Sequence, residues 1–132
     1  MKFFAYPSNP IIKNYLKAKA AMVKLWTPVG GRLPLCSICV RPTRSPEGHH
    51  LLGGMGGRRG PTDIRLIVPV CNQSKSDCHN KLAHGGETIQ WQRLYYVLGD
   101  GDLVEGYRIV CEAAHGSGDI PEPNIEEDVW KI

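Results

Sequence analysis

Residues 36–84 read CSICVRPTRSPEGHHLLGGMGGRRGPTDIRLIVPVCNQSKSDCHNKLAH, and they hold four of the five cysteines and four of the five histidines. Thiolate and imidazole are the side-chain ligands that zinc and similar transition metals take from proteins. Core packing alone does not explain so many of them in one short stretch. The stretch therefore predicts a metal site.

The cysteines of this stretch form two pairs. Cys36 and Cys39 have C-x-x-C spacing, which in a tight turn presents both sulfurs to one ion. Cys71 and Cys78 supply the other half of a tetrahedral site, across a polar insert that can loop out. A redox C-x-x-C is the competing interpretation, but redox pairs stand at strand-to-helix junctions of α/β folds, which the flanking sequence does not resemble. We expect a structural zinc.

His49 and His50 lie between the two pairs. Adjacent residues of an extended segment point to opposite sides, so one imidazole can bind a metal while its neighbour does something else. This feature moves the prediction from a purely structural zinc toward catalysis.

The rest of the 132-residue chain predicts a single α+β unit with many turns. Apolar spacing predicts a basic helix that starts at Asn9-Pro10 and ends after Trp26, and a second helix over residues 87–98. A buried strand is expected over residues 63–70, and another over 103–111. We divide the chain into a basic helical segment (1–32), a metal core with its trailing helix (33–98) and an acidic extension (99–132).

Charge is distributed unevenly along the chain. Residues 1–99 carry a net charge of +10 and residues 100–132 a net charge of −7. A basic body attracts polyanions, and nucleic acid is the commonest one inside cells, although a merely solvated face has the same composition. The candidate phosphate contacts are Lys13, Lys17, Lys24, Arg58 and Arg59.

The acidic C-terminal segment allows three interpretations. It can be a disordered end, a segment that docks a protein partner through Val129-Trp130, or a nucleic-acid mimic that lies on the basic body. The sequence has neither a secretory signal nor a run of about 20 apolar residues. We therefore expect an intracellular protein without membrane contact, where thiols stay reduced and bind metal.

Taken together, these motifs resemble the HNH (ββα-metal) endonuclease family, and in particular its small phage-type members. The resemblance covers about residues 33–90. It rests on C-x-x-C, a strand with a histidine pair, a strand that reads Val68-Pro69-Val70-Cys71, then Cys78-His79 and Gly86-Glu87.

The resemblance implies a zinc-stapled ββα-metal core that cuts DNA, duplex or branched. His50 would be the general base, and His49 and His79, with His84 as a further candidate, would bind one catalytic magnesium, manganese, nickel or zinc ion. Cys36, Cys39, Cys71 and Cys78 would hold a separate structural zinc.

Three features depart from the family pattern. The asparagine that gives the family its name would fall at Leu66, so we expect Asp63 or Arg65 to orient His50. His79 and His84 are five residues apart, where two ligands on one helical face are three or four apart, and six residues separate Cys71 from Cys78. These departures keep two other functions open. One is a zinc-stapled module that binds nucleic acid without cutting it, and the other is a protein adaptor whose acidic tail recruits a partner.

Overall fold

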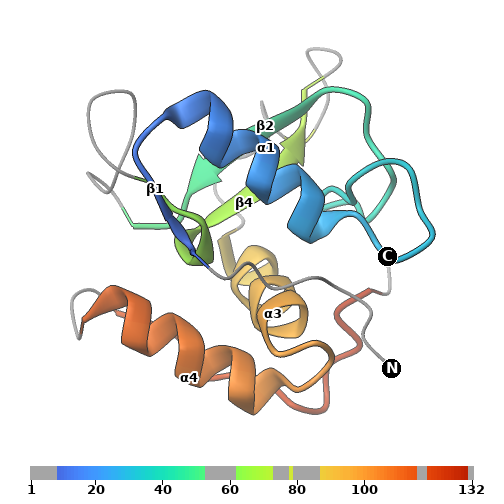
Figure 1. The fold of residues 1–132 in the computed structure, drawn as a ribbon. Coiled ribbons are helices and arrows are strands. Elements are labelled where there is room, and N and C mark those ends of the chain that lie inside the picture. The colour runs from blue at the N-terminus through green and yellow to red at the C-terminus, as the bar shows by residue number, and fades with distance from the viewer. Residues whose placement is uncertain (1–8, 53–61, 73–77, 79–86, 116–118, 131–132) are drawn as a thin grey trace.

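The structure is a computed structural model that describes residues 9–52, 62–72, 78, 87–115 and 119–130. In Figure 1, helix α1 (Tyr15–Trp26) and the short strands form an upper layer, and helices α3 (Glu87–Leu98) and α4 (Leu103–Ala114) form a lower one. The fold is α+β, as the sequence predicts. One buried cluster joins the layers and includes Met22, Trp26, Ile67, Val68, Leu94, Tyr95, Val110 and Val129.

The strands form two antiparallel pairs. Strand β2 (Pro46–His50) pairs with β4 (Ile67–Cys71), and β1 (Ile11–Ile12) pairs with β3 (Thr62–Asp63). The single strand predicted from residue 63 onward is wrong in its first part, because a 3₁₀ turn (Ile64–Leu66) separates β3 from β4. The Asp63 side chain accepts a hydrogen bond from the Arg65 amide at 3.0 Å, which stabilises that turn locally.

Helix α1 begins five residues later than the sequence predicts. Asn14 is its N-cap, with its side chain accepting the Lys17 amide at 3.1 Å. Asn9-Pro10 therefore does not start the helix, because Ile11–Ile12 pair with β3 instead. That partner is distant in sequence, so local periodicity cannot reveal it. The predicted end holds, since α1 ends at Trp26.

Helices α3 and α4 pack against each other through a close approach. Helix α3 has its predicted bounds, but the strand predicted over residues 103–111 is wrong, because this segment is part of α4. Asp102 caps α4 by accepting the Glu105 amide at 3.1 Å, and a Cβ on Gly106 would lie 1.9 Å from the Tyr95 carbonyl oxygen. The helix thus has a local start signal in the Asp102 cap, and Gly106 allows it to lie close against α3. In the described part of the chain, no helix has the length and apolar character to cross a bilayer.

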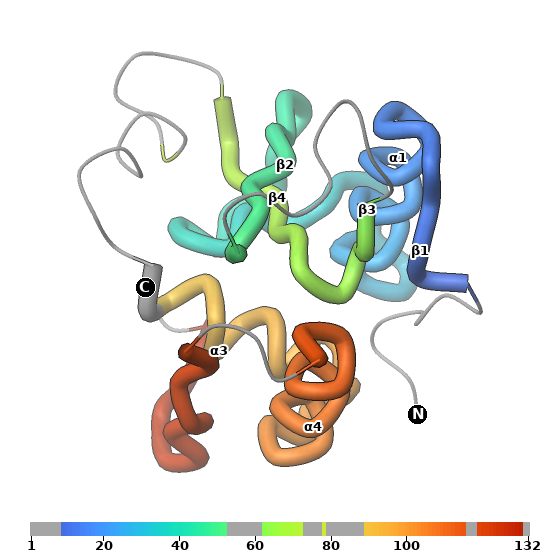
Figure 2. Tube along the Cα trace, turned by 90° about the vertical axis from the view of Figure 1, so that its left-hand side faces the viewer, coloured from blue at the N-terminus to red at the C-terminus, as the bar shows by residue number. Residues whose placement is uncertain are grey.

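The acidic C-terminal segment, residues 119–130, runs without regular secondary structure beside α3 (Figure 2). The Gln92 side chain donates to the Glu122 carbonyl at 3.3 Å and accepts the Asn124 amide at 3.0 Å. Val129 is 4% exposed within the core. The disordered-end interpretation is therefore wrong for these residues, which dock on the protein's own helix.

Candidate metal centre

Cys36 and Cys39 lie in a closed turn. The Val40 amide donates to the Cys36 carbonyl and the Cys36 amide to the Arg41 carbonyl, both at 3.0 Å. Val40 has a φ of 68°, a left-handed conformation that normally favours glycine and costs a β-branched residue energy. The turn is thus held closed against the local preference of its own residue.

Strand β4 brings the second pair of cysteines to this turn. The Ser37 amide donates to the Pro69 carbonyl at 2.8 Å, which fixes the turn to the strand. Cys71 ends β4, and its amide lies 3.4 Å from the Cys36 sulfur. The predicted pairing of the two distant cysteine motifs therefore follows from the register between the turn and β4.

The four sulfur atoms converge on one point. The Sγ atoms of Cys36, Cys39, Cys71 and Cys78 all lie within 4.8 Å of one another. A tetrahedral zinc with Zn–S bonds of about 2.3 Å would set them roughly 3.8 Å apart, and Cys39 and Cys71 lie 4.0 Å apart. All four are free thiols. These residues fit a structural metal such as zinc, as the sequence predicts.

Backbone amides and burial set the chemistry of these thiols. The Ile38 amide points at the Cys36 sulfur at 3.4 Å, and the Cys78 amide at the Cys71 sulfur at 3.5 Å. Burial raises the pKa of Cys36 and of Cys78. Burial also opposes ionisation of Cys39, but hydrogen bonds from the Arg41 backbone and guanidinium outweigh it and lower the pKa of Cys39 to about 7. The site thus combines a buried, shielded interior with donors that stabilise thiolates once a cation is bound.

Arg93 of α3 connects the thiolate cluster to the C-terminal segment, and no functional role was predicted for it from the sequence. The residue is 3% exposed, and its guanidinium donates to the Ser37 carbonyl at 2.6 Å and to the carbonyls of Ile38 and Val129. Burial lowers the pKa of Arg93, while the neighbouring Cys36 and Cys39 favour its charge. The sequence feature that could have indicated this role is a charged residue, Arg93, among the apolar residues of the predicted helix at residues 87–98.

The histidine pair lies on β2, and its two side chains lie on opposite faces of the two-stranded β2–β4 sheet. Residues directly opposite in an antiparallel pair share a face, and His50 lies opposite Ile67. That face meets α1, because the His50 ring stacks on Tyr15 with centroids 6.3 Å apart. His49 shares the other face with Val68 and Val70, and Val70 belongs to the buried cluster of Cys36 and Cys78.

His50 is half-buried under Tyr15. Its Nε2 atom is buried and makes no hydrogen bond within the described part of the chain. Burial, followed by the charge of His49, lowers the pKa of His50. The neutral imidazole is therefore favoured, which is the form that can accept a proton.

Asp63 and Arg65 form a buried ion pair next to β4. The Asp63 carboxylate accepts two bonds from the Arg65 guanidinium, at 2.9 and 2.8 Å, and the two side chains are 9% and 11% exposed. This pair holds the 3₁₀ turn that leads into β4. Its expected role in orienting His50 stays a prediction.

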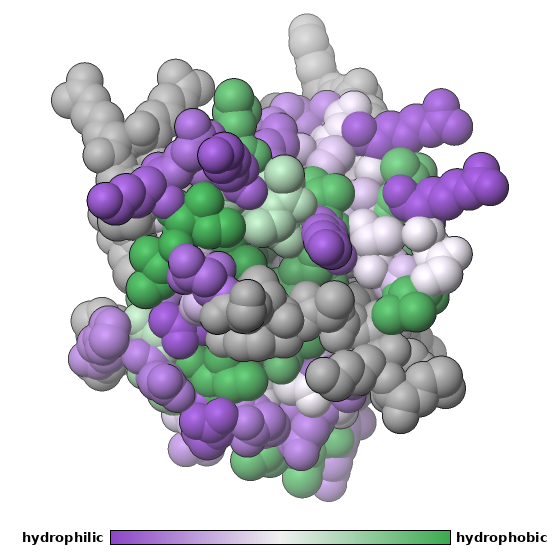
Figure 3. Space-filling view, viewed as in Figure 1, coloured by the Kyte–Doolittle hydropathy of each residue, from purple (hydrophilic) through white to green (hydrophobic). Residues whose placement is uncertain are grey.

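The other predicted site residues fall into two groups. Lys13, Lys17 and Lys24 are exposed on or next to α1, and Figure 3 shows hydrophilic side chains projecting from the face of the molecule that carries this helix. The candidates that lie outside the described residues are His79, His84, Arg58 and Arg59.

Comparison with known proteins adds no assignment to this geometry. No protein-family model, no curated protein and no solved structure matches the chain.

Proposed function

We propose that this protein is a metal-dependent endonuclease of the ββα-metal type, which hydrolyses phosphodiester bonds in DNA. One observation carries the proposal. Two adjacent histidines on β2 lie on opposite faces of a two-stranded sheet whose other strand, β4, ends in the four-cysteine cluster. The four cysteines can complete a structural metal site by themselves, so the two neighbouring histidines are available for another role.

The position of Cys78 supports a second metal site on the His49 face. Cys78 is helical, and its side chain packs with Val70, which shares a face with His49. Along β4, Val68 lies three residues from Cys71, a span of about 10 Å at 3.3 Å per residue. His79 follows Cys78 directly, so in this proposal His49 and His79, with His84 as a further candidate, bind the catalytic ion.

His50 is the general base of the proposed reaction. Its lowered pKa keeps it neutral near pH 7, so it can take a proton from the attacking water. The divalent ion, which can be magnesium, manganese, nickel or zinc, would neutralise charge on the phosphoryl oxygens and on the leaving 3′ oxygen. Tyr15 restrains the His50 ring by stacking on it, and the ring needs a turned or uncovered position to reach water.

The exposed lysines provide the proposed DNA contact. Lys17 and Lys24 lie seven residues apart on α1, two helical turns along one side, and Lys13 precedes the helix cap. Arg58 and Arg59 are proposed to add contacts from the glycine-rich segment. Contacts of this kind are with phosphates, so they predict binding that weakens with salt and depends little on sequence.

Plasmid and branched DNA incubated with the purified protein and Mg²⁺, Mn²⁺ or Ni²⁺ test this function. We expect His50→Ala to lower the cleavage rate roughly a hundredfold or more. His115→Gly is the matched control, because His115 is exposed at the end of α4 and has a φ of 53°, which glycine adopts without strain. Equal cleavage by the His50 variant and the wild type, at equal zinc content, contradicts the role of His50.

A second function is favoured by one observation, the burial of the His50 Nε2 atom against α1. In this alternative the protein is a zinc-stapled module that binds nucleic acid without cutting it. Metal titration separates the two proposals. One tightly held zinc per chain, DNA binding that weakens with salt and no second divalent ion would support the binding module.

A further inference from the structure

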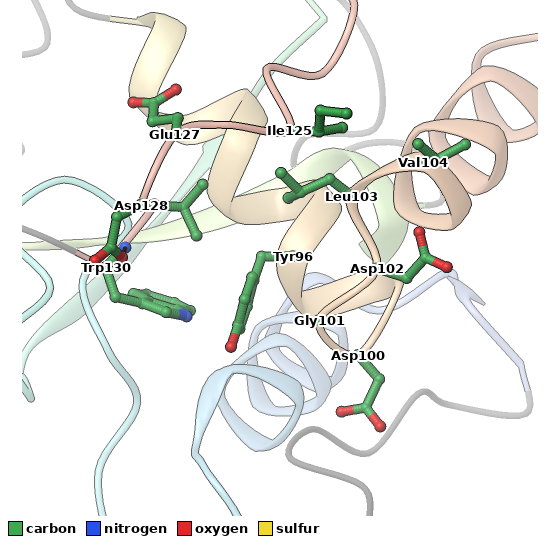
Figure 4. Close-up of a pocket in the computed structure, with 11 residues that line it drawn as sticks. Tyr96, Asp100, Gly101, Asp102, Leu103, Val104, Ile125, Glu127, Asp128 and Trp130 are labelled. Atoms are coloured by element: carbon green, nitrogen blue, oxygen red, sulfur yellow. Dashed lines mark hydrogen bonds between the residues drawn. The ribbon is translucent and has the colours of Figure 1, made fainter.

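An open pocket of about 770 Å³ lies away from the cysteines and the histidine pair. Figure 4 shows that the turn between α3 and α4 forms one side of it and the end of the C-terminal segment forms the other. The structure of both sides is fixed by contacts already described, the Asp102 cap of α4 and the Arg93 bond to the Val129 carbonyl. These contacts hold both walls of the pocket in place.

The lining of this pocket combines apolar surface with negative charge. The rings of Tyr96 and Trp130 meet edge to face at 5.3 Å, and Val104 and Ile125 are 59% and 69% exposed. Neither lysine nor arginine occurs among its described lining residues. Its carboxylates are Asp100, Asp102, Glu127 and Asp128. A binding partner should thus present an aliphatic side chain surrounded by positive charge.

The exposed side of α1 has that chemistry. Leu16 is 75% exposed, more than any other large apolar side chain in the described residues. Lys13 and Lys17 lie three residues before it and one after it, and Lys24 extends the same side of the helix. This side of α1 therefore offers an aliphatic side chain next to positive charge, which is the complement of the pocket. We infer that the acidic pocket receives the Leu16 side of α1 from a second copy of the chain.

The contact must be between molecules, because α1 is already anchored within its own chain. Its opposite side buries Ala18, Met22 and Leu25, which leaves the Leu16 side facing outward. In the proposed contact, Leu16 covers Ile125 and Val104 while the lysines approach the carboxylates of the pocket. The inference does not need the nuclease function, since it uses none of the cysteines or histidines. It does use the lysines of the proposed DNA contact, so DNA and a second copy of the chain would compete for this side of α1.

The symmetry of this contact makes it distinctive. Two different patches meet, so the interface is heterologous: after one contact, one molecule still has an unused helix surface and the other still has an unused pocket. Such association continues to larger assemblies or closes into a ring. Because four carboxylates face lysines across the interface, association should weaken as salt shortens the Debye length from about 10 Å at 0.1 M to about 3 Å at 1 M.

Sedimentation of the purified, nucleic-acid-free full chain tests the inference. We expect the average mass to rise with protein concentration at low salt and to fall at high salt. Leu16→Ser and Ile125→Ser should each weaken association about tenfold or more, since each removes apolar area from the contact. Val29→Ser is the matched control, because Val29 is 70% exposed and lies on neither surface.

Mixing the two variants gives the deciding result. The Leu16→Ser chain keeps an intact pocket and the Ile125→Ser chain keeps an intact helix surface, so the mixture should form a one-to-one complex and stop there. A wild type that remains monomeric at every concentration overturns the inference. So does a mixture that associates no better than the separate variants, because that result excludes a contact between two different patches.

Discussion

Replacement of Arg93 by methionine tests how far the thiolate cluster and the C-terminal segment depend on each other. Methionine keeps much of the apolar volume of the side chain but removes all of its donors. The carbonyls of Ser37, Ile38 and Val129 then lose a buried charged partner. The variant should therefore loosen the cysteine turn and the segment at residues 119–130 together.

The expected loss of stability follows from the number of these contacts. A hydrogen bond to a charged group contributes about 1.5–3 kcal/mol, and part of the gain from three such bonds is offset by the cost of burying the guanidinium. We expect a net loss of about 3–5 kcal/mol out of a total of roughly 5–15 kcal/mol. At an m-value near 2 kcal/mol/M, the urea midpoint of the zinc-loaded protein should fall by about 2 M.

Urea unfolding and hydrogen exchange of residues 119–130 provide the two readouts. Arg108→Met is the matched control, because the Arg108 side chain is 60% exposed and its ion-pair partners among the described residues are Glu105 and Glu112 on the surface of α4. Arg93→Lys keeps the charge but cannot span three carbonyls, so it should recover only part of the stability. An unchanged midpoint in Arg93→Met, with unchanged protection of the segment, would refute the reasoning.

Three further changes have defined outcomes. Val40→Gly should raise the free energy of unfolding in urea by about 0.5–1 kcal/mol, because glycine adopts a φ of 68° without strain and this gain exceeds its entropic cost. A lower free energy of unfolding would show that the Val40 backbone is not strained. Gly48→Ala should lower the free energy of unfolding by about 1 kcal/mol, since its Cβ would lie 2.7 Å from the Ile67 Cδ1 atom and 3.3 Å from the Tyr15 hydroxyl. Unchanged stability would show that both side chains can move aside without cost. Removal of zinc by a chelator should lower the melting temperature, and added zinc should restore it, whereas identical melting of metal-free protein would show that the cysteine cluster does not stabilise the fold.

The sequence alone determined those features that depend on local chemistry. The C-x-x-C pair, the cysteine that ends the predicted strand and the nearby Cys78 were sufficient to predict the four thiols whose sulfur atoms lie within 4.8 Å of one another. The helix at residues 87–98 followed from apolar periodicity. In both cases the residues that carry the signal are close in sequence or have a coordination chemistry that few other patterns share.

Only the tertiary structure decided the features that depend on distant partners. Ile11–Ile12 became a strand because β3 lies beside them, and Gly106 is needed in α4 because the helix lies so close to the Tyr95 backbone. The acidic tail docks on α3 through Gln92 and Arg93, and neither residue carries a recognisable motif. Pairing energy of this kind is shared between segments that are far apart in the chain, so no local window of sequence contains it.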